Sequence, residues 1–229
     1  MSDIPKFFYQ SWDEEIPKQI LSLTMKHLPK DFIYKRFSLD DVRNYLLNNW
    51  GINYVNLYDS YNKIPHKIDL WRYCILYDTG GIYMDADCVL KSDLNQLLNY
   101  DAVFVTNIRG VQNIFNGFII TTAKNPIIKD IIEYMVIKGS EISNYYYNCE
   151  KLYTILKSYI NLNHIIHEYI THNENFSNKK ICVLLDKYSF INFRYNAYFN
   201  NTIILTETNS YYPYKKKIIR KYFKIINRK

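Results

Sequence analysis

Two aspartates, Asp85 and Asp87, are the residues of this sequence best suited to chemistry. In an extended chain, residues two apart point to the same side, so both carboxylates project together. Paired carboxylates are hard oxygen ligands that suit Mg²⁺ or Mn²⁺, and these ions often complete their coordination shell with substrate phosphates. The pair therefore predicts a divalent-cation site for a diphosphate. Spacing alone is weak support, since 14 aspartates in 229 residues give about one such pair by chance.

A second pair of charged residues, Asp69 and Arg72, precedes the two aspartates. Three positions apart, they share one face of a helix. A carboxylate and a guanidinium held in this way can orient several sugar hydroxyls through charge-assisted hydrogen bonds. The plainer interpretation is a surface ion pair, which contributes little. Because the helix runs directly into the turn at Asp85, the sequence favours one shared crevice for both pairs.

The elements that must position these residues are predicted to be a helix, a turn and a strand. Apolar spacing predicts a helix over 64–77, which Gly80 and Gly81 terminate. A short strand at 82–84 then leads directly into Asp85. In α/β sheets, ligands bind beyond the carboxyl ends of the strands, and this places both aspartates at such an end.

Strands and helices alternate along the rest of the chain, which predicts an α/β domain with a mostly parallel sheet flanked by helices. Ser38 with Asp41 predicts a capping box that opens a helix to about Trp50, and Pro126 predicts the start of a helix that ends near Lys138. A helical pattern also covers the polar, tyrosine-rich residues 145–171. The remaining expectations are a helix at 16–28 and strands at 6–11, 32–37, 102–106, 118–121, 181–185 and 202–205.

The positive charge of the chain is concentrated in its C-terminal segment. The formal net charge is +7, and residues 215–229 hold eight lysines and arginines and no acid, which leaves −1 for all other residues. A nucleic-acid groove within the domain is therefore not expected. We predict one domain over 1–214 and a basic amphipathic helix over 215–229.

This basic segment has two interpretations. Its apolar residues fall on one face of a helix, which suits contact with an anionic membrane surface, but a terminal helix docked on the domain gives the same pattern. A signal peptide and a transmembrane segment are not found, and the four scattered cysteines suit a reducing compartment. A cytoplasmic or peripheral-membrane location is expected. The apolar residues are Ile218, Ile219, Tyr222, Phe223 and Ile226.

Three stretches of the sequence resemble the sugar-binding, DXD-containing region of glycosyltransferase family 32. They are IPKFFYQSW at 4–12, HKIDLWRY at 66–73 and LYDTGGIYMDAD at 76–87, and the resemblance extends over about residues 4–121. The family includes fungal Golgi mannosyltransferases and is related to the large bacterial glucosylating toxins. The resemblance implies a Rossmann-like GT-A fold and a hexosyltransferase that uses Mn²⁺ or Mg²⁺. It also implies a UDP- or GDP-hexose donor, a hydroxyl acceptor on a glycan, protein or lipid, and transfer with retention.

The resemblance also assigns roles to the four charged residues. Asp69 and Arg72 would hold the donor sugar. Asp85 would contact the ribose, the sugar or the metal, and Asp87 would be the direct metal ligand.

Three uncharged residues gain roles in the same way. Trp12 would stack on the nucleotide base, although a core aromatic beside the first strand is the other interpretation. Tyr83 would line the nucleotide pocket, and Asn116 matches a family position near the donor.

The last third of the sequence departs from the family. Many members have a late histidine and a Ser-Trp element near the metal, whereas no tryptophan follows Trp71 here. Asn209 or Ser210 is the candidate for the missing oxygen ligand.

Two other functions compete with glycosyl transfer. The segment around Asp85 and Asp87 also resembles the first motif of haloacid-dehalogenase-like phosphotransferases, in which one aspartate attacks phosphate and the second moves protons. That family expects the motif on an early strand and a late acidic pair, and neither is present. A non-catalytic carbohydrate-binding module would retain the fold without turning over a donor.

Overall fold

The computed structural model describes residues 4–207, apart from gaps at 14, 17, 108–111, 142–143, 145, 163–167 and 190–193. The predicted candidates Asn209 and Ser210 and the predicted helix over 215–229 lie outside the described residues. Among the described residues, no helix is long and apolar enough to span a bilayer.

A ten-stranded curled sheet forms the centre of the molecule, with strand order β2-β1-β3-β6-β5-β8-β9-β10-β4 and with β7 paired to β8. The predicted α/β class is thus confirmed. The strands are β1 (Phe7–Ser11), β2 (Ile33–Phe37), β3 (Gly81–Met84), β4 (Cys88–Leu90), β5 (Ala102–Asn107), β6 (Ile114–Thr121), β7 (Glu168–Ile170), β8 (Lys180–Ser189), β9 (Arg194–Phe199) and β10 (Thr202–Glu207).

The sheet is mixed, so the prediction of a mostly parallel sheet was wrong. The pairs β1–β2, β1–β3 and β5–β8 are parallel, and the other pairs between described strands are antiparallel. The connections explain the difference. Asn200 and Asn201, with φ of 44° and 65°, join β9 to β10 in a two-residue turn, and so short a connection permits only antiparallel neighbours.

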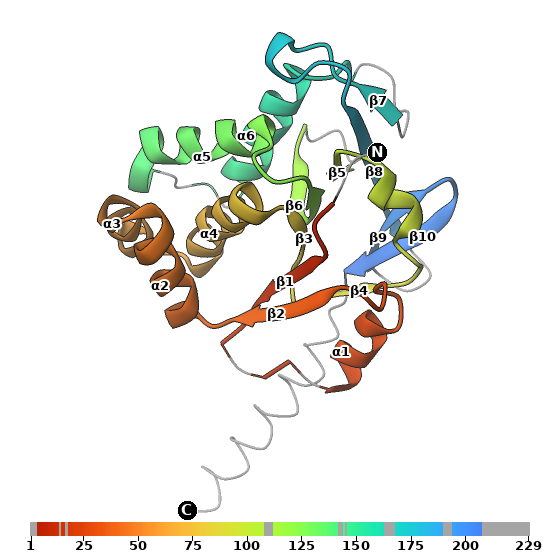
Figure 1. The fold of residues 1–229 in the computed structure, drawn as a ribbon, viewed down its shortest axis with the longest axis horizontal. Helices are drawn as coiled ribbons and strands as arrows, with labels where there is room; N and C mark the ends of the chain where they lie inside the picture. The colour runs from red at the N-terminus through yellow and green to blue at the C-terminus, as the bar shows by residue number, and fades with distance from the viewer. Residues whose placement is uncertain are drawn as a thin grey trace, which may run out of the picture.

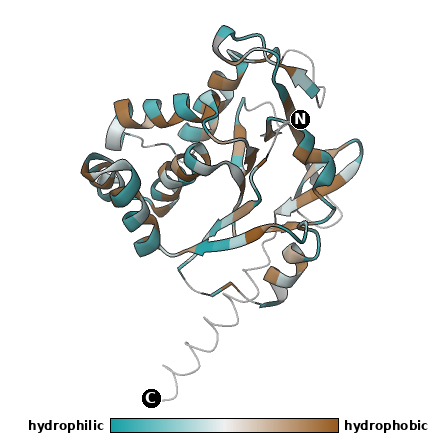
Figure 2. Cartoon of the chain, viewed as in Figure 1, coloured by the Kyte–Doolittle hydropathy of each residue, from teal (hydrophilic) through white to brown (hydrophobic). Residues whose placement is uncertain are grey.

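The helices α2, α3, α4, α5 and α6 lie together on one side of the strands (Figure 1). Hydrophobic and hydrophilic residues alternate around α2 and α5, which bury only one side (Figure 2). The helix α1 lies against β4. The helices are α1 (Lys18–Met25), α2 (Leu39–Trp50), α3 (Ile52–Ser60), α4 (Ile64–Thr79), α5 (Pro126–Lys138) and α6 (Tyr147–Lys157), with short 3₁₀ helices η1 (Asn95–Asn99), η2 (Gly139–Glu141) and η3 (Glu174–Phe176).

Local signals placed several of these elements correctly. The capping box is present, since the Ser38 hydroxyl accepts from the Asp41 amide and the Asp41 carboxylate accepts from the Ser38 amide. The helix predicted from Pro126 is α5, and Asn125 caps it. The helix predicted over 145–171 was wrong in its second half, because 147–157 is the only helical stretch among the described residues of this range. At β7, buried Tyr169 alternates with exposed neighbours and pairs with β8, which is the two-residue period of a strand.

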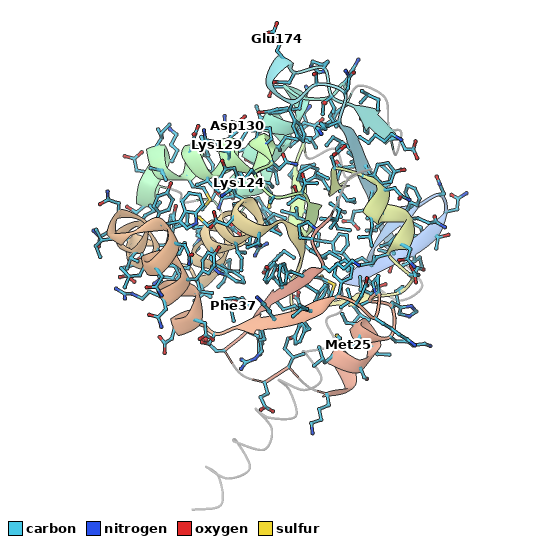
Figure 3. All side chains as sticks on the ribbon, viewed as in Figure 1. Met25, Phe37, Lys124, Lys129, Asp130 and Glu174 are labelled. Carbon is cyan, nitrogen blue, oxygen red and sulfur yellow. The ribbon has the colours of Figure 1, made fainter. Side chains whose placement is uncertain are left out.

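Alternate residues of the central strands enter two buried clusters, one on each face of the sheet. On β1, Tyr9 joins the cluster beneath the helices and Phe8 joins the cluster on the other face. On β3, Tyr83 and Ile82 divide in the same way. Phe37, at the carboxyl end of β2 and labelled in Figure 3, packs against Trp71 of α4 with ring centroids 4.8 Å apart and ring planes tilted by 47°. The carboxyl ends of the central strands, where the aspartates lie, are therefore supported from both faces of the sheet.

Candidate functional site

The helix α4 is the central buried helix of the molecule, and it carries the first half of the site. Nearly every residue from His66 to Leu76 is buried, because α4 lies between the sheet and its neighbouring helices. The side chains of Asp69 and Arg72 are only 7% and 4% exposed. A surface ion pair, the plainer interpretation of this spacing, is thereby excluded. Charges so deeply buried must be paired and hydrogen-bonded to remain charged.

Arg72 is the centre of a buried charge cluster that also contains Asp69 and Asp85. Its Nη2 lies 3.3 Å from Asp69 Oδ1 and 3.2 Å from Asp85 Oδ1, and its Nη1 donates to the carbonyl oxygen of Asn116 at 2.7 Å. The guanidinium lies 4.4 Å from the centre of the Tyr83 ring. Burial lowers the pKa of Arg72, but Asp85, Tyr83 and Asp69 together raise it by more than burial lowers it. The guanidinium is therefore held positively charged.

The carboxylate of Asp69 is held on both oxygens. Asn116 Nδ2 donates to Oδ1 at 3.0 Å, and Asn148 Nδ2 donates to Oδ2 at 2.8 Å. Burial raises the pKa of Asp69, but the charge of Arg72, the nearby His66 and the hydrogen bond from Asn148 together lower it by more, so the pKa lies below its usual value. Asp69 is therefore a fixed anion.

Two glycines connect the helix to the aspartates. Gly80 and Gly81 have φ of 63° and 106°, which side-chain-bearing residues rarely adopt. A Cβ atom would lie 2.5 Å from the Ala123 backbone nitrogen at Gly80 and 2.7 Å from the Phe7 carbonyl oxygen at Gly81. This tight turn fixes the position of β3 relative to α4, and hence the position of Asp85 relative to Arg72.

Asp85 leaves β3 at the carboxyl end of the strand, as predicted, and its position is fixed from several sides. Its Oδ1 accepts the Tyr83 hydroxyl at 2.7 Å, and its backbone carbonyl accepts from Gln10 Nε2 at 3.3 Å. Its amide donates to the Gly117 carbonyl at 2.8 Å. A Cβ atom on Gly117 would lie 2.4 Å from Asp85 Oδ2, so only glycine leaves room for this carboxylate. The side chain of Asp85 remains 30% exposed, and hence accessible to a ligand.

Asp87 is the exposed member of the pair. The protein atoms around its carboxyl group, and then the negative charge of Asp85, raise its pKa to about 6. Two neighbouring carboxylates that disfavour each other's charge are a donor set that a divalent cation would stabilise. The residues present therefore fit a Mg²⁺ or Mn²⁺ ion.

Among the described residues, no group of three or more His, Cys, Asp or Glu side chains could hold a metal ion. Mg²⁺ commonly binds through one or two carboxylates together with waters and substrate phosphates, so two aspartates suffice. The strand β10 ends at Glu207, directly opposite Cys88, which follows Asp87. Asn209, the predicted third ligand, lies two residues farther along the chain.

The structure also brings Trp12 and Asn116 to the aspartates. Trp12 follows β1 and packs against a small cluster that includes Ala86, the residue between the two aspartates. Trp12 is partly exposed, so it is not a buried core residue. Asn116 lies on β6 and bridges Asp69 to the Tyr73 hydroxyl, with both distances 3.0 Å.

A surface hollow of about 590 Å³ lies apart from this cluster. It is formed by β2 and α2 and includes Phe37 and Tyr45 but neither aspartate. The chemistry-bearing residues are not in that hollow, so we do not assign the substrate to it.

Sequence reasoning missed several members of the cluster. Gln10, Tyr73 and Gly117 lie within or next to the predicted motifs, so their proximity to Asp85 and Asn116 could have been suspected. Asn148 lies in the polar segment before the late strands, 79 residues from the aspartate that it contacts. No local pattern marks it.

Residues 3–104 match the family described as the glycosyltransferase sugar-binding region containing the DXD motif. An uncharacterised glycosyltransferase of Acanthamoeba polyphaga mimivirus is 31% identical over 62% of this chain and 59% of that protein. Inositol phosphoceramide mannosyltransferase 3 of Schizosaccharomyces pombe is 33% identical over 50% of this chain and 33% of that protein. The chain thus spans less than two thirds of the length of either relative.

Among solved structures, the PaToxG glycosyltransferase superposes with a TM-score of 0.51 at 15% identity, over 66% of this chain and 68% of that chain. This likeness supports the fold. Together with the family match, which includes Asp69, Arg72, Asp85 and Asp87, these findings confirm the predicted resemblance.

Proposed function

We propose that this chain, which carries the DXD sugar-binding region of glycosyltransferases, transfers a hexose from a UDP- or GDP-sugar to a hydroxyl acceptor with retention. One observation carries the proposal. The buried guanidinium of Arg72 joins Asp69 on α4 to Asp85 at the end of β3, so the predicted sugar-holding pair and the aspartate pair form one connected site.

The donor sugar is proposed to bind beside Asp69 and Arg72. Both groups keep their charge and their orientation without the substrate, so little ordering is needed when the sugar binds. A fixed carboxylate and a fixed guanidinium distinguish hydroxyl positions on a sugar ring by direction. We expect them to set which hexose is used.

The diphosphate is proposed to bind at Asp85 and Asp87, with Asn209 as a further oxygen ligand. Two extended residues span at most about 7 Å, so a chain that leaves β10 opposite Cys88 can bring Asn209 to this pair. When bound there, Mn²⁺ or Mg²⁺ would neutralise negative charge on the departing nucleoside diphosphate. Asp85 keeps its own orientation through Tyr83 and Arg72.

The nucleotide base is proposed to stack on Trp12, which is partly exposed and lies beside Ala86. An indole face binds the flat surface of a base without strong preference among bases. Tyr83 is buried beneath the site, with its hydroxyl on Asp85, so we expect it to support the pocket from below.

The acceptor is proposed to be a glycan, protein or lipid that presents a hydroxyl group. The fungal relatives are named for mannosyl transfer to inositol phosphoceramide, and a lipid acceptor therefore deserves the first test. The eight basic residues in 215–229 would favour an anionic membrane surface, since each contributes on the order of 1 kcal/mol there.

A panel of UDP-glucose, UDP-galactose and GDP-mannose tests the donor, with Mn²⁺ or with a chelator. The matching donor should raise the unfolding temperature only with Mn²⁺, because ligand binding stabilises the folded state by mass action. The same mixture should slowly release free sugar. A chain that binds and hydrolyses none of a full set of nucleotide sugars would contradict the proposal.

The same assay separates the two competing functions. A phosphotransferase would release inorganic phosphate from a phosphate ester, and a binding module would release neither product. The geometry disfavours Asp85 as a phosphate-attacking nucleophile, because its Oδ1 is already taken by the Tyr83 hydroxyl and the Arg72 guanidinium.

A further inference from the structure

Asn148 is a buried polar residue whose role the proposed reaction does not yet explain. It lies in the first turn of α6, is fully buried, and donates from Nδ2 to Asp69 Oδ2 at 2.8 Å. The helix α6 packs on β6, which carries Asn116. Asn148 therefore reaches the aspartate from an element that supplies none of the other site residues.

The amide of Asn148 is satisfied on one side only. A carboxylate oxygen accepts hydrogen bonds and cannot donate them, so Nδ2 must face Asp69 and Oδ1 must point away. Oδ1 is buried and has no hydrogen-bond partner among the residues that the structure describes. An unpaired buried acceptor is costly, and an apolar side chain of the same volume would fill the space without that cost. Packing alone does not explain an asparagine at this position.

Asn116 on β6 and Asn148 on α6 each donate a hydrogen bond to a different carboxylate oxygen of Asp69. Nδ2 of Asn116 is 3.0 Å from Oδ1, and Nδ2 of Asn148 is 2.8 Å from Oδ2. Rotation of an aspartate carboxylate about its last torsion is soft, so a bond to one oxygen does not fix the plane of the group. A donor on each oxygen does fix it.

We propose that Asn148 is a positioning residue that fixes the carboxylate plane of Asp69 for the donor sugar. The inference rests on the proposed function, since it assigns Asp69 to the sugar. Asn148 acts only through Asp69. Its loss should affect steps that need the sugar oriented and should spare binding of the nucleotide portion.

The test replaces Asn148 by leucine, which keeps the volume and removes the donor. Asn148→Leu should lower kcat for Mn²⁺-dependent hydrolysis of UDP-glucose or GDP-mannose, whichever the wild type uses, by about 10- to 100-fold. The Kd for UDP or GDP should stay within about twofold of the wild type. Asn148→Ala serves the same purpose should the leucine variant fail to fold.

A double-mutant cycle separates positioning from general damage. If Asn148 acts through Asp69, then Asn148→Leu should cost little more once Asp69→Asn is present, because coupled residues are not additive. Independent structural damage would instead multiply the two losses.

Asn125 provides a matched control. It is also a buried asparagine with an unpaired amide atom, but it caps α5 and does not contact the cluster. Asn125→Ala should lower the unfolding temperature and leave kcat within about twofold. Normal kcat in a folded Asn148→Leu protein, or additive losses in the cycle, would overturn the inference. A wild type that neither binds nor hydrolyses any donor would refute the proposed function itself, and the assignment of Asn148 with it.

Discussion

Two arginine–aspartate clusters in this molecule both contain ion pairs, but they differ in burial and in the number of aspartates that the arginine contacts. Arg43 of α2 makes a two-pronged contact with Asp59 of α3, with Nη2 to Oδ2 at 2.8 Å and Nε to Oδ1 at 3.1 Å. These side chains are 42% and 44% exposed. Arg72 has longer ion-pair distances, yet it is 4% exposed and is shared by two aspartates.

The comparison teaches that burial, more than contact geometry, separates a functional charge cluster from a surface one. Water competes for the exposed pair, so its formation adds little. Arg72 and Asp69 are too deeply buried for solvent to replace a lost partner, so each group depends on the others. The same burial would strengthen their action on the donor sugar that we propose to bind there.

The first prediction removes the exposed carboxylate of the site. Asp87→Asn should abolish metal-dependent donor turnover while leaving the protein folded, because a neutral amide is a poor ligand for a hard cation. Circular dichroism and turnover with Mn²⁺ measure the two properties. Asp31→Asn is the matched control, since Asp31 pairs with Lys6 ahead of β1 and β2, at the end opposite the site. Near wild-type activity of Asp87→Asn would contradict the metal assignment.

The second prediction opens the buried cluster. Arg72→Ala should reduce turnover by at least about 10²-fold, since an error of about 1 Å in substrate position can cost that much. It should also lower the free energy of unfolding by about 3–5 kcal/mol, because Asp69 loses its buried counter-charge. Urea denaturation and donor hydrolysis give the two values, and UDP or GDP should still bind. Equal loss of nucleotide binding would indicate a structural role instead.

The third prediction concerns Gly117→Ala, a substitution that should displace the Asp85 side chain without altering its chemistry. In Gly117→Ala, the new methyl group would lie 2.4 Å from Asp85 Oδ2 and 2.3 Å from the Phe115 ring, so these side chains must shift. The fold should survive, and turnover should fall by about tenfold or more. Gly51→Ala is the control, because no heavy atom lies within 4 Å of its added Cβ although φ is 84°. It should cost stability and spare the rate.

The smallest effect is expected at the exposed pair. Asp59→Asn should leave turnover unchanged and shift the unfolding midpoint by little more than the experimental error, because solvent replaces the lost contact. Thermal denaturation at low and high salt measures it. A loss of activity comparable to that of Arg72→Ala would break the distinction between the two clusters.

The charged residues that the sequence predicted to lie together, and that the structure brings together, come from neighbouring parts of the chain. Asp69, Arg72, Asp85 and Asp87 lie within one helix, one turn and one strand, and helical spacing and strand ends are properties of neighbouring residues. The resemblance to a known family supplied Asn116. Asn148 was not predictable, because only the packing of α6 on β6 brings it to Asp69.

The same reasoning explains the errors in the fold. Alternation of strands and helices indicates an α/β class, but it does not determine the direction in which two distant strands pair. The prediction failed where β3 pairs antiparallel with β6, with Gly81 opposite Thr121. The short strands β4 and β7 were missed because three residues give no measurable period, and only their partner strands define them.

The pairing of β4 with β10, in which Val89 lies opposite Thr206, has a consequence for the order of events during synthesis. At roughly 5–20 residues per second, β10 leaves the ribosome on the order of ten seconds after β4. The helix α4 and the strands β1, β3 and β6 have all been made by then. We expect chains stopped before Thr202 to be cut by protease at 88–90 and to resist cleavage within α4. The nascent protein would thus assemble its sugar-orienting charges early and its aspartate turn late, and it would become active only when almost all of the described chain has been translated.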